Sequence, residues 1–133
     1  MGLYSRLVMD HFMSPQNMGA LQDSDAVGKS GNEKCGDSMK IYLKIRNEII
    51  VNAGYQVDCC GSAIAASSVI TERIKGRPAS EAAALARQAV EELQSGLPAY
   101  KQHCPEMVEQ ALQNALSQYQ ESRDAASEEG QKI

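Results

Sequence analysis

Tryptophan is absent from this chain, and Phe12 is its only phenylalanine. A hydrophobic core therefore has to be built from aliphatic side chains, methionine and tyrosine. Long apolar runs are lacking as well, because Arg6, Asp10 and His11 interrupt the first 20 residues. We accordingly expect no signal peptide, no membrane span or membrane partner, and a cytoplasmic location.

An excess of positive charge is also lacking. The chain carries 13 Lys and Arg against 17 Asp and Glu, which gives a formal net charge of -4 at pH 7. This balance argues against nucleic acid as the main partner. The length of 133 residues is enough for one domain with one core. We expect that domain over residues 1–121 and a polar, flexible C-terminal tail over residues 122–133.

Cysteines are few, and they do not follow the compact Cys-x-x-Cys spacing of a zinc ribbon. The four are Cys35, Cys59, Cys60 and Cys104. Without an export signal a reduced compartment is expected, so these thiols are metal-binding, catalytic or simply buried rather than part of a disulfide framework. Taken one at a time, each is explained as well by a small buried hydrophobe as by a ligand.

Two alternating segments predict an antiparallel β-hairpin. Apolar and polar residues alternate over residues 39–46 and again over residues 49–57, with a turn at Asn47-Glu48 between them. The second segment is expected to place on one side Ile49, Val51, Ala53, Tyr55 and Val57. A further short strand is expected near residues 25–29.

Helical spacing predicts the rest of the domain. The expected helices cover residues 3–13, 62–75, 80–95 and 105–120. Ser62 is placed to cap the second helix, Gly76 to close it and Pro105 to begin the last. The small residues at 63–68 are explained by close helix packing, and His11 by a surface or packing position.

The predicted hairpin brings thiols together. Cys35 lies just before its first strand and Cys59-Cys60 just after its second, and a hairpin places those two ends side by side. Gly61 lets the chain turn there. Cys60 also precedes a helix start, whose positive end lowers the pKa of a thiol and favours the thiolate.

Further donor groups lie in other predicted loops. The candidate donors are Cys35, Asp37, Cys60, His103 and Cys104, a set that suits Zn²⁺ or an iron–sulfur cluster. Plainer explanations stand beside this one. Asp37 is explained by an Asx turn, His103 by a surface position and Lys101 by a solvated loop charge.

Several motifs together resemble one family. In chain order they are Gly31-Asn32, Cys35-Gly36-Asp37, Cys60-Gly61-Ser62-Ala63-Ile64-Ala65 followed by Ser67-Ser68, then Leu97-Pro98 and Lys101-x-His103-Cys104. With Tyr4 and Pro15-x-Asn17-x-Gly19 near the start, the chain resembles the IscU/NifU-type scaffold for iron–sulfur cluster assembly over about residues 3–120.

The resemblance implies an α+β fold, in which a small antiparallel β-sheet of about three strands has helices packed on one face and the cysteines clustered at one end. It implies a transient [2Fe-2S] cluster on Cys35, Cys60 and Cys104, with Asp37 or His103 as the fourth ligand. Zn²⁺ is expected to occupy the same site in family members. Lys101 matches a family lysine next to the site.

The implied function is that of a scaffold and carrier rather than an enzyme. Sulfur arrives as a persulfide from a cysteine desulfurase by thiol exchange, with Cys104 as the first expected acceptor and Cys35 as the second. The cluster then passes to acceptor apoproteins. An iron donor or a ferredoxin is a further expected partner.

Two departures from the family pattern bear on these expectations. Cys59 stands where the family commonly has glycine. The family's chaperone motif Leu-Pro-Pro-Val-Lys is replaced here by Leu97-Pro98-Ala99-Tyr100-Lys101. This second departure leaves binding of an Hsp70-type chaperone open. The alternatives are a zinc-binding sulfur acceptor that activates a cysteine desulfurase, and a structural zinc domain. The gap between Cys60 and Cys104 lacks the long insertion of the zinc-dependent SufU branch, which favours the cluster scaffold.

Overall fold

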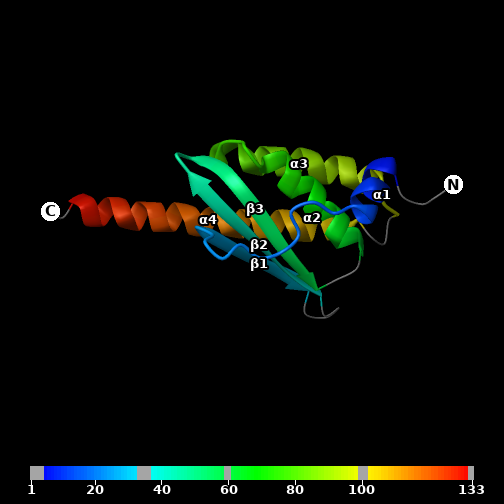
Figure 1. Ribbon diagram of the computed structural model, residues 1–133, viewed down its shortest axis with the longest axis horizontal. Helices are drawn as coiled ribbons and strands as arrows, with labels where there is room; N and C mark the ends of the chain where they lie inside the picture. Colours follow the sequence, from blue (N-terminus) through cyan, green and yellow to red (C-terminus); the bar gives the residue numbers. More distant parts are fainter. Residues whose placement is uncertain (1–4, 33–36, 59–60, 99–101, 132–133) are drawn as a thin grey trace.

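The computed structural model describes residues 5–32, 37–58, 61–98 and 102–131, and within these ranges all side chains except those of residues 32, 37 and 123–131. Helices and strands follow one another as drawn in Figure 1. They are α1 (Arg6–Met13), β1 (Ala26–Asn32), β2 (Asp37–Arg46), β3 (Ile49–Asp58), α2 (Gly61–Ile74), α3 (Ala79–Ser95) and α4 (His103–Gln131).

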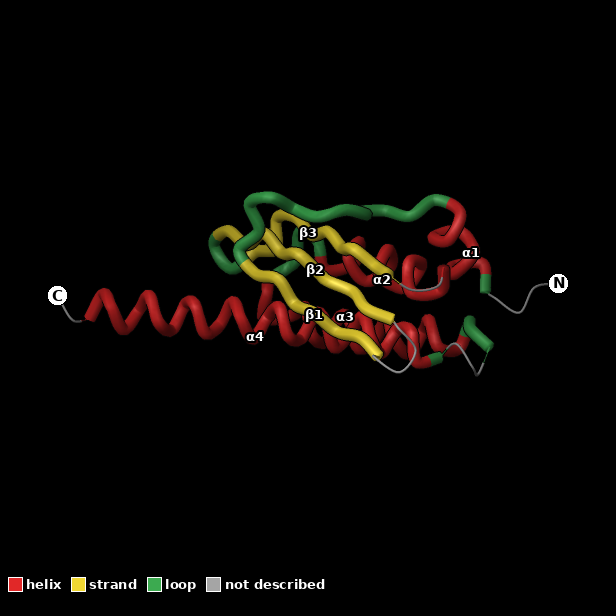
Figure 2. The backbone as a smooth tube through the Cα atoms, turned by 90° about the horizontal axis from the view of Figure 1, so that it is seen from below, coloured by secondary structure: helices red, strands yellow, loops and turns green. Residues whose placement is uncertain are grey.

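The strands form an antiparallel sheet in the order β1-β2-β3. β2 and β3 make the predicted hairpin, with Ile41 opposite Tyr55, and β1 pairs with the other side of β2, with Gly28 opposite Ile41. α4 packs on β1 and β2, α2 packs on β3, and α3 packs on both helices. Figure 2 shows the helices gathered behind one face of the sheet. The predicted α+β architecture is therefore confirmed.

The core lies between the sheet and the helices and is almost wholly aliphatic. One buried cluster includes Ile41 and Leu43 from the sheet, Ile70 of α2, Leu93 of α3 and Leu112 of α4, all fully buried. Burial of such side chains stabilises the fold by about 1.5 to 3 kcal/mol each. Among the described residues, no helix has both the length and the apolar character that crossing a membrane requires.

The prediction for the buried face of β3 is wrong at the start of the strand. Ile50 is fully buried, whereas Val51 is 43% exposed. The cause is a β-bulge: Ile45 lies opposite Ile50 but Lys44 lies opposite Asn52, so Val51 is an extra residue in the pairing. One extra residue reverses which side chains face the core. Beyond the bulge the predicted alternation holds.

Short side chains let α2 approach its neighbours closely. Ala65 and Ala66 are fully buried. The buried Ser67 satisfies its hydroxyl within the helix, since its Oγ donates to the Ala63 carbonyl at 2.8 Å. The interpretation of residues 63–68 as a packing segment is therefore confirmed.

α4 begins and ends away from the predicted positions. It starts at His103 instead of Pro105 and continues to Gln131 instead of ending near Gln120. The residues after 120 include several good helix formers and no proline, so nothing in them stops the helix. In Figure 1 this last part of α4 extends beyond the sheet and the other helices. The flexibility expected for residues 122–133 stays a prediction.

Both outer strands have edge groups that bond other parts of the chain. On β1, the Val27 N–H donates to Gln118 Oε1 at 2.7 Å, and Asn114 Nδ2 donates to the Lys29 carbonyl at 2.7 Å. On β3, the segment before β1 lies along the edge, and the Gly19 N–H donates to a β3 carbonyl at 2.8 Å. These bonds cover parts of both edges of the sheet.

Candidate metal centre

The strand ends define one end of the sheet. Asn32, the last residue of β1, lies opposite Asp37, the first residue of β2. Ser38 in turn lies opposite Asp58, the last residue of β3. The connections from β1 to β2 and from β3 to α2 therefore leave the sheet at the same end. The predicted meeting of the two hairpin ends is confirmed.

Two predicted ligands belong to these connections. Cys35 lies between β1 and β2 and Cys60 between β3 and α2, and both are outside the described residues, as are Cys59 and Lys101. The backbone of Asp37 starts β2, but its side chain is not described. The roles of these residues stay predictions. Among the described residues, no group of three His, Cys, Asp or Glu side chains could hold a metal ion.

α4 brings a third segment toward the same end. Gln118 bonds the backbone of Val27, and Asn114 bonds the backbone of Lys29. From Gln118 to Asn114 the position moves four residues back along α4, about 6 Å, and from Val27 to Lys29 it moves two residues forward along β1, about 7 Å. α4 and β1 therefore run side by side in opposite directions. The start of α4, at His103, therefore lies toward the end of the sheet where β1 ends, as Figures 1 and 2 show.

Cys104 and His103 are the two predicted ligands whose side chains the structure describes. Cys104 is fully buried, whereas His103 is exposed, and Cys104 Sγ lies 3.8 Å from His103 Nε2. Their predicted loop position is wrong, since both lie in the first turn of α4. Cys104 continues the buried face formed one turn later by Met107 and Val108. That helical spacing is the sequence signal for its burial.

Gly61 begins α2 directly after Cys60. Close packing against Phe12, rather than a positive φ, explains why this position is glycine. The glycines with positive φ are Gly19 and Gly76 among the described residues. A β-carbon at Gly61 would lie 1.9 Å from Cε2 of Phe12. The ring of Phe12 thus rests on the start of α2, and 49% of that residue remains exposed. The missing side chain of Gly61 therefore allows a close contact between α1 and α2, and the turn expected just before it lies outside the described residues.

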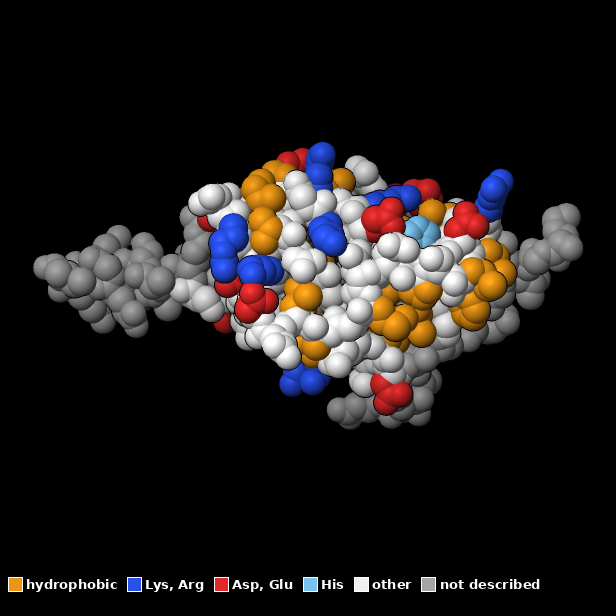
Figure 3. All heavy atoms as spheres, viewed as in Figure 1, with side chains coloured by type: hydrophobic (Ala, Val, Ile, Leu, Met, Phe, Trp, Pro, Cys, Tyr) orange, Lys and Arg blue, Asp and Glu red, His pale blue; other side chains and the backbone are white. Residues whose placement is uncertain are grey.

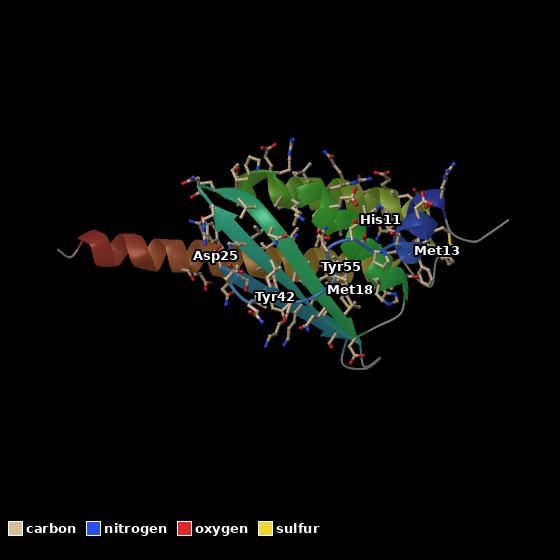
Figure 4. All side chains as sticks on the ribbon, in the orientation of Figure 1. His11, Met13, Met18, Asp25, Tyr42 and Tyr55 are labelled. Carbon is tan, nitrogen blue, oxygen red and sulfur yellow. The ribbon has the colours of Figure 1, made fainter. Side chains whose placement is uncertain are left out.

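His11 makes a specific contact that sequence reasoning missed. Its Nδ1 lies 2.7 Å from Ser68 Oγ, and the same hydroxyl accepts from the Gln16 N–H at 2.8 Å. Beside this contact lies an open concavity of about 480 Å³, lined by residues that include His11 (labelled in Figure 4), Glu72 and Lys75. The two partners are far apart in the sequence, so no local pattern indicates that they meet.

Tyr55 lies close to this contact on β3 and is fully buried. Among the described residues, its hydroxyl has no hydrogen-bond partner. Burial raises the pKa of Tyr55, and the nearby Ser68 hydroxyl opposes this rise without reaching hydrogen-bond geometry. An unsatisfied hydroxyl in the core costs stability.

The geometry defines a class of protein: a small α+β domain in which the strand ends next to two cysteine-bearing connections lie at one end of an antiparallel sheet. The chain belongs to the NifU-like N-terminal domain family, whose model matches residues 3–126. The family resemblance seen in the motifs is thereby confirmed.

Curated relatives and solved structures agree with this assignment. The chain is 43% identical to iron–sulfur cluster assembly scaffold protein IscU 1 of Archaeoglobus fulgidus over 88% of its length and 76% of that protein. It is 39% identical to iron–sulfur cluster assembly scaffold protein IscU of Escherichia coli K12, over 92% of its length and 98% of that protein. The N-terminal part of a NifU-like protein from Brucella abortus has the same fold, with a TM-score of 0.71 and 23% identity over 90% of this chain and 95% of that one.

Proposed function

We propose that this protein is a non-enzymatic scaffold that assembles an iron–sulfur cluster and passes it to acceptor apoproteins. Membership of the NifU-like family, with relatives named as such scaffolds, supports the proposal. The observation that carries it is the strand register, which directs the connections holding Cys35 and Cys60 to one end of the sheet. α4 runs toward that end and begins with the segment that holds Cys104. A cluster requires thiolates from separate segments to meet in this way.

The proposed cargo is a [2Fe-2S] cluster held by Cys35, Cys60 and Cys104, with Asp37 or His103 as the fourth ligand. Three thiolates suit iron, and a carboxylate or imidazole in the fourth position is a harder ligand that favours release. The described donors fit this role. The Cys104 thiol is sheltered from water, and the exposed imidazole of His103 stands 3.8 Å from it.

Sulfur is proposed to arrive as a persulfide on a cysteine desulfurase. A thiolate of this chain attacks the terminal sulfur, the S–S bond breaks, and the desulfurase cysteine leaves as a thiolate, so this step consumes no oxidant or reductant. Cys104 and Cys35 are the proposed acceptors. Because Cys104 is fully buried, acceptance there requires the first turn of α4 to open. Lys101 supplies a positive charge that favours the thiolate.

Further partners follow from the chemistry of the cargo. Conversion of the transferred sulfur to sulfide consumes electrons, for which a ferredoxin is the proposed donor, and an iron donor supplies the metal. We propose that this work takes place in the cytoplasm.

Anaerobic reconstitution tests the proposal. Protein incubated with ferrous iron, cysteine, a reductant and a cysteine desulfurase is expected to become reddish and to gain charge-transfer absorption in the visible range. Cys35→Ser, Cys60→Ser and Cys104→Ser are each expected to abolish that absorption. Cys59→Ser is the matched control and is expected to retain it, with folding of every variant checked by circular dichroism.

Contrary results would distinguish a failure of the proposed scaffold function from a failure of the proposed ligand assignment. If tightly bound zinc is the only metal that the protein ever takes up, the scaffold is overturned in favour of a zinc-binding sulfur acceptor that activates a desulfurase. A cluster retained in one of the first three variants, or lost in Cys59→Ser, overturns the ligand assignment while leaving the scaffold in place.

A further inference from the structure

The open face of the sheet carries two lysines side by side. Lys29 of β1 lies directly opposite Lys40 of β2, and both side chains are exposed. We call them the lysine pair. Side chains directly opposite in antiparallel strands have β-carbons about 5 Å apart, and like charges there repel. Because the neighbours Met39 and Ile41 point into the core, the lysine at position 40 faces away from the helices.

Other basic residues on the same face are neutralised by carboxylates. Lys44 bonds Asp23, and Arg46 Nη1 lies 3.3 Å from Asp25 Oδ2. Among the described side chains, no carboxylate lies within ion-pair distance of the lysine pair. Figure 3 shows mixed basic and acidic side chains at one end of this face and a separate basic patch at its lower rim. The repulsion within the lysine pair is therefore not offset inside the described part of the chain.

The lysine pair borders a concavity of about 290 Å³. Its lining includes Gln56, which lies opposite Lys40, but Tyr42 Oη already donates to Gln56 Oε1 at 2.6 Å. Among the described residues of the lining, Asp58 is the one acidic residue, and it belongs to none of the ion pairs that the described side chains form. The described side chains of the lining thus carry two positive charges against one negative charge, on a chain whose formal net charge is -4.

We propose that the lysine pair is the docking point for an acidic segment of a partner protein. Carboxylates of an acidic partner would offset the repulsion between the two ammonium groups and be attracted to both of them. This attraction would fix where the partner binds. Nucleic acid is a poorer match, because the patch is small and the chain as a whole is acidic. The proposal uses described residues alone and does not depend on a bound cluster.

The lysine pair lies near the end of the sheet that is next to the candidate ligands. Lys29 and Lys40 lie about three residues, or about 10 Å, from the strand ends at Asn32 and Asp37. A partner held there would stand beside the end of the sheet to which the candidate ligands belong. Docking on this face leaves α4 and the opposite side of the sheet untouched.

A binding titration on the full metal-free chain tests the inference. The probe is a fluorescein-labelled peptide of alternating glutamate and glycine, followed by anisotropy at about 0.1 M salt, where long-range charge effects are screened. Binding is expected, and it is expected to weaken with added salt. The double variant Lys29→Gln/Lys40→Gln should bind about fivefold or more weakly, as expected for the loss of two exposed ion pairs.

The matched control removes two positive charges from the same face without touching the lysine pair. Lys44→Gln/Arg46→Gln is expected to change the affinity less than twofold. Equal losses in both double variants, or no binding of the peptide at all, would overturn the proposal. If inorganic phosphate at equal charge displaces the peptide, the lysine pair is a small-anion site. If a single-stranded oligonucleotide binds more tightly than the peptide, the lysine pair is part of a nucleic-acid surface. Either result overturns the proposal.

Discussion

At the scale of single residues, the hydroxyl of Tyr55 lowers the stability of the folded protein, because it is buried and has no hydrogen-bond partner among the described residues. Tyr55→Phe keeps the ring and removes the polar group. The variant is expected to gain about 1 kcal/mol in free energy of unfolding, because an unsatisfied buried group costs about 1 to 3 kcal/mol. Urea unfolding followed by circular dichroism measures the change. A loss of stability would show that the hydroxyl is bonded in solution.

The alkaline pH dependence of stability is an internal control for this variant. Burial raises the pKa of Tyr55, so the folded protein keeps its phenolic proton at pH values at which the unfolded chain has released it. The corresponding stability is fully present below the unfolded tyrosine pKa of about 10 and is lost as pH rises from there through the higher pKa of the folded protein. In Tyr55→Phe this part of the alkaline decline is expected to be absent.

At the scale of elements, the contact between β1 and α4 leaves no room for a side chain. A β-carbon at Gly28 would lie 1.9 Å from the Ala111 carbonyl oxygen and 2.4 Å from the Ala115 nitrogen. Helix backbone atoms cannot rotate aside, so Gly28→Ala is expected to lower the free energy of unfolding by about 3 kcal/mol, the upper part of the range for overpacking. Chemical denaturation of the purified variant measures this loss.

Gly61→Ala is the matched control for Gly28→Ala. Its β-carbon would also meet an atom at 1.9 Å, but that atom is at the edge of the Phe12 ring, which is 49% exposed. The ring can swing toward solvent, so a loss of about 1 kcal/mol or less is expected. Equal losses in the two variants would contradict the view that the rigid α4 backbone decides the outcome at Gly28.

Local patterns predict the elements of this fold but not their irregularities. The hairpin follows from the alternation over residues 39–46 and 49–57, and the helices follow from apolar spacing. The bulge at Val51 is not predictable from local pattern, because Ile49, Ile50 and Val51 are all apolar and the sequence does not indicate which of them faces the core. The late end of α4 is missed for another reason. The apolar pattern stops near Gln120, but the residues that follow include good helix formers and the helix continues to Gln131.

The candidate site is predictable in part, and the limit is again physical. The meeting of the hairpin ends follows from strand pairing. The approach of the Cys104 segment depends on how α4 lies along β1, which rests on contacts between distant residues such as Asn114 and Lys29. The contact between His11 and Ser68 is of the same kind. Sequence spacing reports on neighbours within an element, and these contacts join different elements.

At the scale of the whole molecule, α4 is longer than the body on which it packs, and its last part extends past the sheet in Figures 1 and 2. A chain ending at Glu121 is therefore expected to keep its melting temperature within about 3 °C, because the helix backbone removed lies beyond the sheet and the other helices. Calorimetry checks this. As a control, a chain ending at Gln113 loses the buried Ala115 and the bonds of Asn114 and is expected to lose cooperative unfolding.

The bonded sheet edges described above bear on how this protein behaves in a crowded solution. A bare strand edge is a template on which a second chain adds its own strand, and repeated addition leads toward amyloid-like stacks. Here Asn114 and Gln118 bond the outer side of β1, and Gly19 bonds the outer side of β3. Encounters between molecules are thereby directed to side chains on the surface rather than to backbone. Strand addition by a second chain is therefore hindered where these bonds are made, which favours the separate chain over stacked assemblies.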